Sequence, residues 1–303
     1  DDWQSIYSFL MSSATDFLSY RDGAKVYILQ QTYRFGQQIV DLAAKVTNRI
    51  AVQQRKNVIP KPGARHDIKS IYEFNPQEID LGRGQGTAML LHRHVAGCRE
   101  IGARLIREGL PFWNERGANP LARSADCKAY LAFKKAHQTG EIDYLDLMSL
   151  LQVVPSRKMT PEGVVQLVNY GAKKKAKEIA VQTAKPYSMD DLSTVFSDLF
   201  LKSIKCGDMS WVDIEYADYY ETLSKKGFDL VNAEPKIVVT TIHGAKGREA
   251  DLVGLFTEAF PRVLESEDEH RIGYVGVTRT RKDLWLIRDQ LVGNWTQEYP
   301  YPI

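Results

Sequence analysis

The sequence predicts an α/β protein with a mainly parallel sheet into which an all-helical subdomain is inserted. Short apolar, β-branched runs alternate with amphipathic helical patterns at both ends of the 303-residue chain. Such alternation is typical of parallel strands connected by helices that cover both faces of a sheet. Between the two ends the apolar spacing is helical and strand patterns are nearly absent. We therefore expect residues 1–112 and 233–303 to build the sheet domain and residues 113–232 to form the helical subdomain.

Apolar spacing and the positions of Gly and Pro define the expected elements. In the sheet domain the expected strands cover residues 25–29, 68–74, 87–91, 237–241, 252–256 and 284–287. Its expected helices cover residues 35–55, 97–108 and 270–281. In the helical subdomain the expected helices cover residues 128–137, 144–152, 161–183, 189–204 and 211–226.

Composition excludes several classes of protein. Lys and Arg (40) nearly balance Asp and Glu (38), so the net charge is +2 and any basic surface must be local. The cysteines, Cys98, Cys127 and Cys206, form no CxxC pair, so neither a zinc site nor a disulfide framework is indicated. No apolar run approaches the ~20 residues that cross a bilayer, and no signal-peptide pattern is visible. We expect a protein without membrane contact in a reducing compartment, the cytoplasm.

A polar segment between two expected strands, residues 241–249, holds several groups that suit a phosphorylated ligand. Thr241 and His243 open the segment, and Gly247 and Glu249 close it. A hydroxyl, an imidazole and a carboxylate so close together could contact a phosphate chain, a sugar hydroxyl or both. A Gly-containing turn with solvated charges is the alternative.

Other polar clusters fall at strand ends, where open α/β sheets place their ligands. They are Gln4 with Tyr7 and Phe9, Tyr33 with Arg34, and the stretch 274–279 that ends in Arg279. Arg34 and Arg279 each lie at the edge of an apolar segment, and guanidinium groups suit a polyphosphate that develops charge. Each arginine alone would more often be a surface or salt-bridge residue.

Taken in order, four segments resemble the later motifs of the UvrD/Rep/PcrA family of superfamily 1 DNA helicases. Residues 1–9 (DDWQSIYSF) are similar to the third motif and residues 30–34 (QQTYR) to the fourth. Residues 241–249 (TIHGAKGRE) resemble the fifth motif and residues 269–279 (EHRIGYVGVTR) the sixth. Residues 88–112 also resemble the family segment between the fourth and fifth motifs. The resemblance implies that the sheet domain is a RecA-like, P-loop NTPase-type second motor domain with a 2B-like helical insertion.

The resemblance implies contacts with ATP for six residues. Gln4 would sense the γ-phosphate, Arg34 would reach it, and Arg279 would be an arginine finger, so these three carry the catalytic role. Such fingers contribute ~10³-fold or more in phosphoryl transfer by stabilising charge in the transition state. The other three would bind the rest of the nucleotide: Tyr33 would stack on adenine, Glu249 would accept from the ribose, and Gly247 would let the backbone approach.

The resemblance also implies a track for single-stranded DNA and for junctions between single and double strands. Tyr7 and Phe9 would present aromatic faces to the bases, a contact of ~1–3 kcal/mol per base that tolerates any sequence. Thr241 and His243 would touch the DNA backbone. For His243 the alternative is a hydrogen-bonded loop histidine.

Some positions depart from the family pattern. Trp3 replaces a usual acidic residue, and residues 10–13 (LMSS) replace the usual end of the third motif, so the fine DNA contacts there are in doubt. Arg248 stands at a common leucine position. Arg281 adds a charge after the sixth motif.

Two elements of an ATPase are missing from the sequence. No Gly-Lys-[Ser/Thr] occurs, so no Walker A loop holds phosphates, and no strand-borne Asp-Glu organises Mg²⁺. In the family both belong to the N-terminal helicase domain. We therefore expect a C-terminal half that begins inside a motif, meets ATP and Mg²⁺ across a cleft with that domain, and is inactive alone. Family analogy implies 3′→5′ movement on DNA and a bacterial or phage-infected cell.

Two alternatives remain open at this point. The chain could be a non-catalytic DNA-binding or regulatory module with degenerate motor motifs. The helical subdomain could instead be chiefly a protein-docking surface, with partly exposed aromatic side chains. These would be Trp211, Tyr216, Tyr219 and Tyr220. At helical spacing such residues are more often part of a core.

Overall fold

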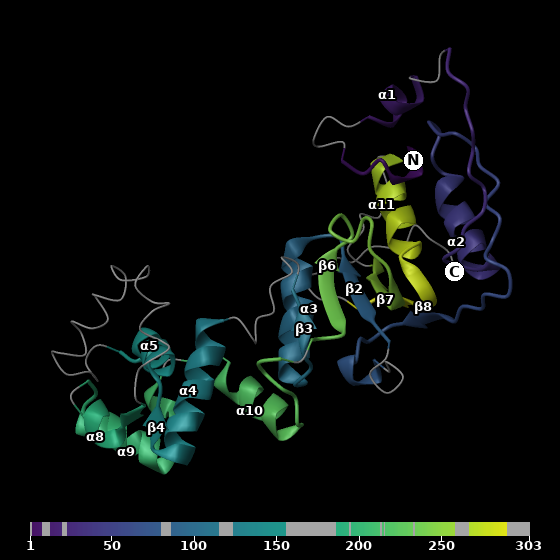
Figure 1. Cartoon of the computed structure of the whole chain (residues 1–303). Helices are drawn as coiled ribbons and strands as arrows, with labels where there is room; N and C mark the ends of the chain where they lie inside the picture. Colours follow the sequence, from purple (N-terminus) through teal and green to yellow (C-terminus); the bar gives the residue numbers. More distant parts are fainter. Residues whose placement is uncertain are drawn as a thin grey trace. The chain divides into compact units, whose positions relative to one another are not determined.

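Six parallel strands form the main sheet of the protein in a computed structural model (Figure 1). The strands lie in the order β1-β8-β7-β2-β6-β3. Their bounds are β1 Ile68–Ile71, β2 Ala88–His92, β3 Phe112–Trp113, β6 Ile237–Thr241, β7 Ala250–Phe256 and β8 Thr280–Ile287. The structure describes residues 2–7, 13–19, 23–79, 86–114, 124–155, 186–193, 195–212, 214, 216–232, 234–257 and 267–289.

The chain divides into two compact units. One contains Asp1–Ala118 and Pro235–Ile303, so both ends of the chain build the sheet domain. The other contains Asn119–Glu234. The predicted α/β class with a parallel sheet is confirmed, because every strand pair of the six-stranded sheet is parallel.

The central strands are mostly apolar because both faces of the sheet are buried. Side chains of a strand point alternately to the two faces. In β2, Met89 and Leu91 enter one core, whereas Ala88 and Leu90 enter the other. The neighbouring strands β7 and β8 follow the same alternation.

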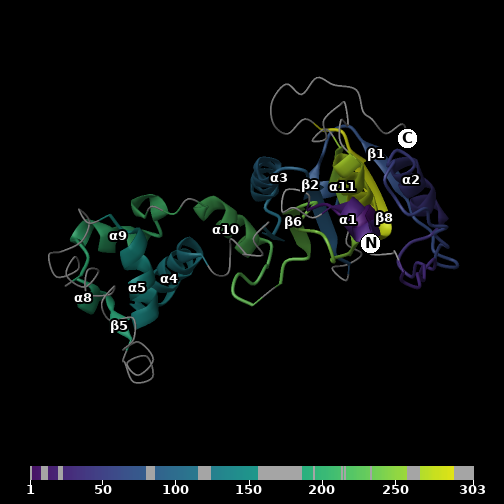
Figure 2. The ribbon, with the colours of Figure 1, turned by 90° about the horizontal axis from the view of Figure 1, so that it is seen from above.

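Helices cover each face of the sheet (Figure 2). Helices α2 (Gln37–Thr47) and α11 (Glu267–Val277) share one core with the short η1 helix (Asp2–Gln4). Helix α3 (Val95–Arg107) packs on the other face through Cys98, Ile101 and Leu105. Two further short helices of this unit are α1 (Ala14–Ser19) and η3 (Pro76–Glu78).

Two sequence predictions for the sheet domain are wrong. Residues 25–29 form no strand: Leu29 is 94% exposed, and the bridge that follows this segment joins Gln31 to Ile59. An apolar run cannot form a strand without a partner edge, which the described residues do not provide. Residues 112–113, for which no strand is predicted, form β3 and extend the sheet beside β6. Two residues are too short to give a periodic signal.

The helix predicted over residues 35–55 ends early. Helix α2 stops at the C-cap Asn48, and the chain then turns, with the Ile50 amide donating to Thr47. The Gln53 side chain holds this turn by donating to the carbonyls of Thr47 and Ile50. The apolar spacing continues through Ile50, which is buried, but it belongs to the turn and not to the helix.

Within the described residues, the second unit is helical except for one short sheet. Its helices are α4 (Ala125–Thr139), α5 (Tyr144–Val153), α8 (Met189–Leu192), α9 (Asp198–Cys206), η5 (Met209–Trp211) and α10 (Ala217–Lys225). The expectation of an all-helical subdomain needs correction, because β4 (Glu141–Ile142) and β5 (Tyr187–Ser188) pair antiparallel. The helix predicted at 161–183 lies outside the described residues.

Two predicted helices of this unit are shorter than expected, and local capping explains one of them. The helix expected over 189–204 divides into α8 and α9, because Ser188 forms a capping box and Ser197 caps the second helix. The helix expected over 211–226 begins only at Ala217. Tyr219 and Tyr220 are buried, so these two rings belong to the core of the unit and are not an exposed docking surface. None of the described helices has the length and apolar composition needed to span a bilayer.

Candidate functional site

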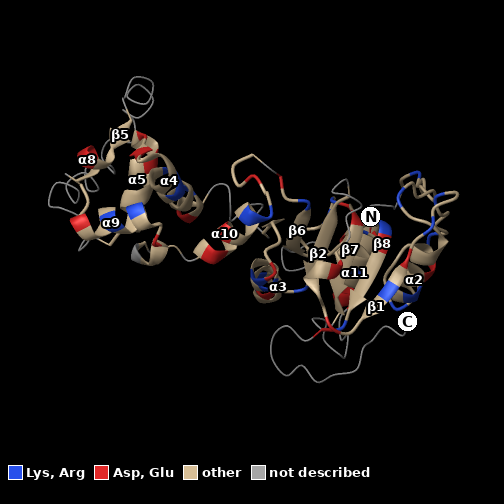
Figure 3. Ribbon diagram, turned by 90° about the horizontal axis from the view of Figure 1, so that it is seen from below, with Lys and Arg blue, Asp and Glu red and all other residues tan. Residues whose placement is uncertain are grey.

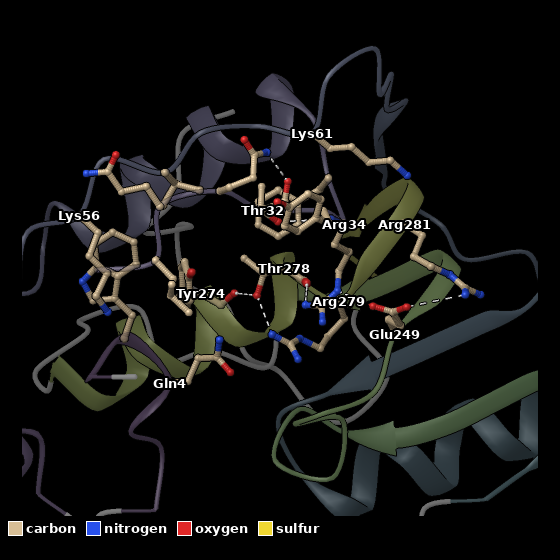
Figure 4. Close-up of a pocket in the computed structure, with 17 residues that line it drawn as sticks. Gln4, Thr32, Arg34, Lys56, Lys61, Glu249, Tyr274, Thr278, Arg279 and Arg281 are labelled. Atoms are coloured by element: carbon tan, nitrogen blue, oxygen red, sulfur yellow. Dashed lines mark hydrogen bonds and ion pairs between the residues drawn. The ribbon is translucent and has the colours of Figure 1, made fainter. Parts of the chain in front are cut away.

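A cavity of about 470 Å³ opens beside the ends of β7 and β8 (Figure 4). Its walls come from segments far apart in the chain: η1, residues 29–35, the loop after α2, and the end of α11. Polar and aromatic side chains that line it are Trp3, Gln4, Gln30, Gln31, Thr32, Tyr33, Arg34, Lys56, Lys61, Glu249, Tyr274, Thr278, Arg279 and Arg281. The cavity therefore unites predicted nucleotide-binding residues from the third, fourth, fifth and sixth motifs.

The cavity lies at the amino edge of the sheet. Glu249 directly precedes β7 and Arg279 directly precedes β8. Open α/β sheets commonly place ligands at the carboxyl ends of their strands, so this position is a correction to the general expectation from strand ends. Thr241, in contrast, closes β6 at the carboxyl edge. The segment 241–249 thus begins at one edge of the sheet and ends at the other.

The crossing of this segment follows from its sequence. Ile242 and Ala245 are fully buried in the same core as α2 and α11, so the segment runs over that face of the sheet. The Ile242 amide donates to the His92 carbonyl at 3.1 Å, which anchors the start of the crossing to β2. Gly247 adopts φ +83°, a left-handed conformation that favours glycine. A Cβ on Gly247 would meet no atom within 4 Å, so its surroundings leave room for an approaching ligand.

Arg279 is a buried cation. Only 1% of the residue is exposed, and its guanidinium donates to the Val275 carbonyl at 2.8 Å and to Thr278 Oγ1 at 2.9 Å. Among the described residues, no carboxylate lies within 4 Å of it. Burial, together with the nearby charge of Arg34, lowers the pKa of the guanidinium to about 10, so it stays charged at neutral pH. A buried charge bonded only to neutral oxygens favours an anionic ligand in the adjoining cavity.

Arg34 and Glu249 form an ion pair across the cavity wall. Arg34 Nε donates to Glu249 Oε2 at 2.6 Å, and Arg34 Nη1 donates to the Thr278 carbonyl at 2.9 Å. The backbone of Arg34 is held in turn by Thr32 Oγ1 at 3.3 Å. Residues more than two hundred positions apart therefore converge, in agreement with the proximity that the motif order implies.

Tyr33 and Gln4 take different positions on the rim. Tyr33 is 80% exposed, so its ring is accessible to a planar ligand. Gln4 is half-buried and lines the cavity from η1. Its backbone carbonyl accepts from Lys246 Nζ at 2.9 Å, which connects the third-motif segment to the crossing segment 241–249.

Several residues that line the cavity were not predicted from the motifs. Lys56 and Lys61 come from the loop after α2, which belongs to no motif. Between Lys45 and Arg65 the chain carries six basic and no acidic residues, and Figure 3 shows blue segments around α2 and this loop. A local charge count could have found this basic stretch. Trp3, noted as a departure from the family pattern, packs edge-on against Tyr274 with ring centroids 5.3 Å apart.

The predicted DNA-contacting residues lie near the carboxyl edge and contact one another. His243 Nε2 donates to the Ile6 carbonyl at 3.0 Å, and Tyr7 Oη donates to the His243 carbonyl at 3.3 Å. Lys246 Nζ lies 4.9 Å from the centre of the Tyr7 ring. Thr241 Oγ1 accepts from the Gly244 amide at 3.1 Å. Phe9 lies outside the described residues.

These contacts make the hydrogen-bonded loop histidine the better description of His243. Burial, with the nearby charge of Arg93, lowers the pKa of His243, so its imidazole is neutral at neutral pH. The Nε2 proton is already donated to Ile6 and is not available to a phosphate. Tyr7 differs, because an aromatic face contacts a base without using the hydroxyl group.

Comparison with known proteins supports the assignment of the fifth and sixth motifs. Residues 236–287 match the family model of the UvrD-like helicase C-terminal domain. The match covers β6, β7, α11 and β8, including Glu249 and Arg279. No curated protein matches the chain closely enough to count as a relative. The match and the parallel sheet support a C-terminal region of the UvrD/Rep helicase type.

Proposed function

We propose that this chain is the C-terminal half of an ATP-dependent DNA helicase that couples ATP hydrolysis to movement on single-stranded DNA. It would supply the second motor domain and an inserted helical subdomain. The observation that carries the proposal is the buried Arg279, which lines the cavity. Among the described residues, no carboxylate forms an ion pair with it. Its neighbours Arg34 and Glu249 add the second cation and the carboxylate that a nucleotide needs.

The cavity residues fit a nucleoside triphosphate. Arg34 and Arg279 would bind phosphate oxygens and stabilise the charge that develops during transfer. The exposed ring of Tyr33 would stack on the base, and Glu249 would accept from a ribose hydroxyl. Gln4 would report the state of the phosphates to the crossing segment, to which it is joined through Lys246. Mg²⁺ and the remaining phosphate contacts would belong mainly to an N-terminal helicase domain of the same protein.

The crossing segment would link ATP to DNA. Its end at Glu249 lies at the cavity, and its start lies beside Tyr7 at the opposite edge of the sheet. A rearrangement of phosphates at one end would therefore move groups at the other end through a short piece of chain that buried Ile242 and Ala245 anchor to the core. We propose single-stranded DNA, reached from junctions with double strands, as the ligand of that edge. The direction of movement would be 3′→5′, in the cytoplasm of a bacterial or phage-infected cell.

Hydrolysis assays on the full-length protein test the proposal. Arg34→Ala and Arg279→Ala should each abolish DNA-stimulated ATP hydrolysis, because each removes a cation from the same cavity. Both variants should keep most of their affinity for single-stranded DNA, measured by fluorescence anisotropy. If both variants remain active, the assignment of the cavity to ATP is wrong.

The isolated 303-residue chain provides the complementary test. It should show no DNA-stimulated hydrolysis, since it lacks a Walker A loop. Turnover above background that disappears with Arg279→Ala would contradict the proposal that this chain forms only one side of the ATP site.

A further inference from the structure

Glu249 lies between two arginines, only one of which the motifs account for. Oε2 of Glu249 accepts from Arg34 Nε at 2.6 Å, while Oε1 lies 3.7 Å from Arg281 Nη1 (Figure 4). The register of β7 and β8 explains the second contact. Ala250 pairs with Thr280, so Glu249, which precedes Ala250, lies near Arg281, which follows Thr280. Arg281 lines the same cavity as Arg34 and Arg279.

Arg281 is anchored on the side away from Glu249. Its Nη2 lies 3.4 Å from Asp251 Oδ2 and donates to Thr87 Oγ1 at 3.2 Å. Asp251 is fixed in turn, because the Thr87 amide donates to its Oδ2 at 3.0 Å. The Arg281 side chain is 41% exposed, so its guanidinium can shift toward Glu249 without breaking a packed core. The Arg281 guanidinium therefore lies near Glu249, at 3.7 Å, without a close hydrogen bond to it.

Arg34 faces two competing demands if the cavity binds ATP. Its Nε is engaged by Glu249 in this structure, yet the proposed function requires its guanidinium at a phosphate. Phosphate binding would draw Arg34 away and leave the Glu249 carboxylate without its close partner. The Glu249 side chain is 39% exposed, so the loss of this partner raises the free energy of the bound state by the modest amount of an exposed ion pair.

We propose that Arg281 is a positioning residue that takes over Glu249 when a polyphosphate engages Arg34. This inference rests on the proposed function, because it assigns the cavity to a nucleotide. Arg281 thereby lowers the cost of releasing Arg34 and keeps Glu249 oriented toward the ribose. It acts through Glu249 and does not itself bind phosphate.

A double-mutant cycle separates this role from a direct phosphate contact. The probe is inorganic tripolyphosphate, which has no ribose, so the sugar contact of Glu249 does not enter the measurement. Its affinity for the full-length protein is measured by calorimetry for Arg281→Gln, Glu249→Gln and the double variant. Lys282→Gln is the matched control, since Lys282 carries the same charge, lies 3.6 Å from Asp251 and does not line the cavity.

The expected pattern follows from the role of Glu249. Arg281→Gln should weaken tripolyphosphate binding about three- to fivefold, the range for a partly exposed ion pair. Glu249→Gln frees Arg34 and should bind tripolyphosphate at least as tightly as the unaltered protein. In the Glu249→Gln background, Arg281→Gln should have almost no further effect, because coupled residues are not additive. Lys282→Gln should bind like the unaltered protein.

ATP hydrolysis gives a second measurement on the same variants. Arg281→Gln should raise KM for ATP about three- to fivefold and leave kcat nearly unchanged, and Arg281→Lys should recover part of the loss. Equal weakening by Arg281→Gln with and without Glu249 would make Arg281 a direct phosphate ligand and overturn the inference. An effect no larger than that of Lys282→Gln would overturn it too. If tripolyphosphate binding does not depend on Arg34, the proposed function itself is wrong.

Discussion

The two edges of the sheet are joined by one segment, residues 241–249, but they are built in opposite ways. At the amino edge, cations outnumber the carboxylates that line the cavity, and among the described residues the buried Arg279 guanidinium bonds only to neutral oxygens. At the carboxyl edge, polar groups already satisfy one another. Arg93 donates to Glu269 through Nε and Nη2, and His243 donates to the Ile6 carbonyl.

The difference indicates how each edge would meet a ligand. The amino edge has positive charge to spare and should gain free energy from an anion with little rearrangement. The carboxyl edge offers few unused hydrogen-bond donors, so DNA there would be bound mainly through the aromatic face of Tyr7 and the charge of Lys246. The predictions below test this contrast, from the largest expected effect to the smallest.

The largest effect is expected at Arg279. Arg279→Ala in the full-length protein should lower kcat for ATP hydrolysis ~10³-fold or more, because the buried guanidinium would stabilise charge in the transition state. Affinity for single-stranded DNA should change little, since the residue lies at the opposite edge from Tyr7. Arg279→Lys controls for charge: it keeps a cation but cannot bond both Val275 and Thr278. A variant that loses DNA affinity and hydrolysis together would show that the two edges are not separable.

The second prediction concerns pH and the carboxyl edge. Burial lowers the pKa of His92 to about 4, and its Nδ1 accepts from the His94 amide at 3.0 Å. The folded state therefore prefers neutral His92, whereas the unfolded chain binds a proton near pH 6.5. The contribution of His92 to the free energy of unfolding should be complete above pH 6.5. It should fall by up to about 3 kcal/mol as the pH drops to 4.

Denaturant unfolding at several pH values measures this loss. His92→Asn keeps an acceptor for the His94 amide but cannot titrate, so it should reduce the pH dependence. It should not abolish it, because burial also lowers the pKa values of His94 and His243. An unchanged pH dependence in His92→Asn would mean that the buried histidine is not a source of acid sensitivity.

A smaller effect is expected for Tyr7, which tests how the carboxyl edge binds DNA. Tyr7→Ala should weaken binding of single-stranded DNA by ~1–3 kcal/mol, the range for one base stacked on an aromatic ring. Tyr7→Phe removes only the hydroxyl that donates to the His243 carbonyl and should keep most of the affinity. If Tyr7→Phe is as weak as Tyr7→Ala, the hydroxyl matters more than the ring. Unchanged affinity and salt dependence in Tyr7→Ala would remove the residue from the DNA track.

Sequence patterns predicted the parallel sheet because its buried strands are short, continuous apolar runs between helices. The order of four motifs also predicted that Arg34, Glu249 and Arg279 lie close together. It could not predict at which edge of the sheet they lie, because strand order and the crossing of residues 241–249 are properties of tertiary packing. The roles of these residues remain predictions.

Other features were beyond sequence reasoning for local reasons. Residues 25–29 have the composition of a strand, but strand formation depends on a partner edge that composition does not encode. Lys56 and Lys61 reach the cavity from a loop without a motif. The contact of Arg281 with Glu249 depends on the register between β7 and β8, which no spacing along the chain reveals.

The smallest effect is expected at Gly247, within the segment that joins the two edges. Its φ of +83° disfavours any residue with a Cβ, so Gly247→Ala should lower the free energy of unfolding by about 1 kcal/mol. Gly247→Asn should cost less, because Asn tolerates the left-handed conformation. No atom lies within 4 Å of a Cβ at this position, so the change in stability depends on backbone conformation and not on space.

Nucleotide binding separates the two reasons for a glycine at this position. If the backbone at Gly247 must approach the nucleotide closely, Gly247→Asn should raise KM for ATP more than Gly247→Ala does, although it is the more stable variant. If only the turn matters, KM should follow stability, and Gly247→Ala should be the more impaired. The first outcome would extend the nucleotide surface from the cavity into the crossing segment. The second would confine that surface to the side chains at the amino edge.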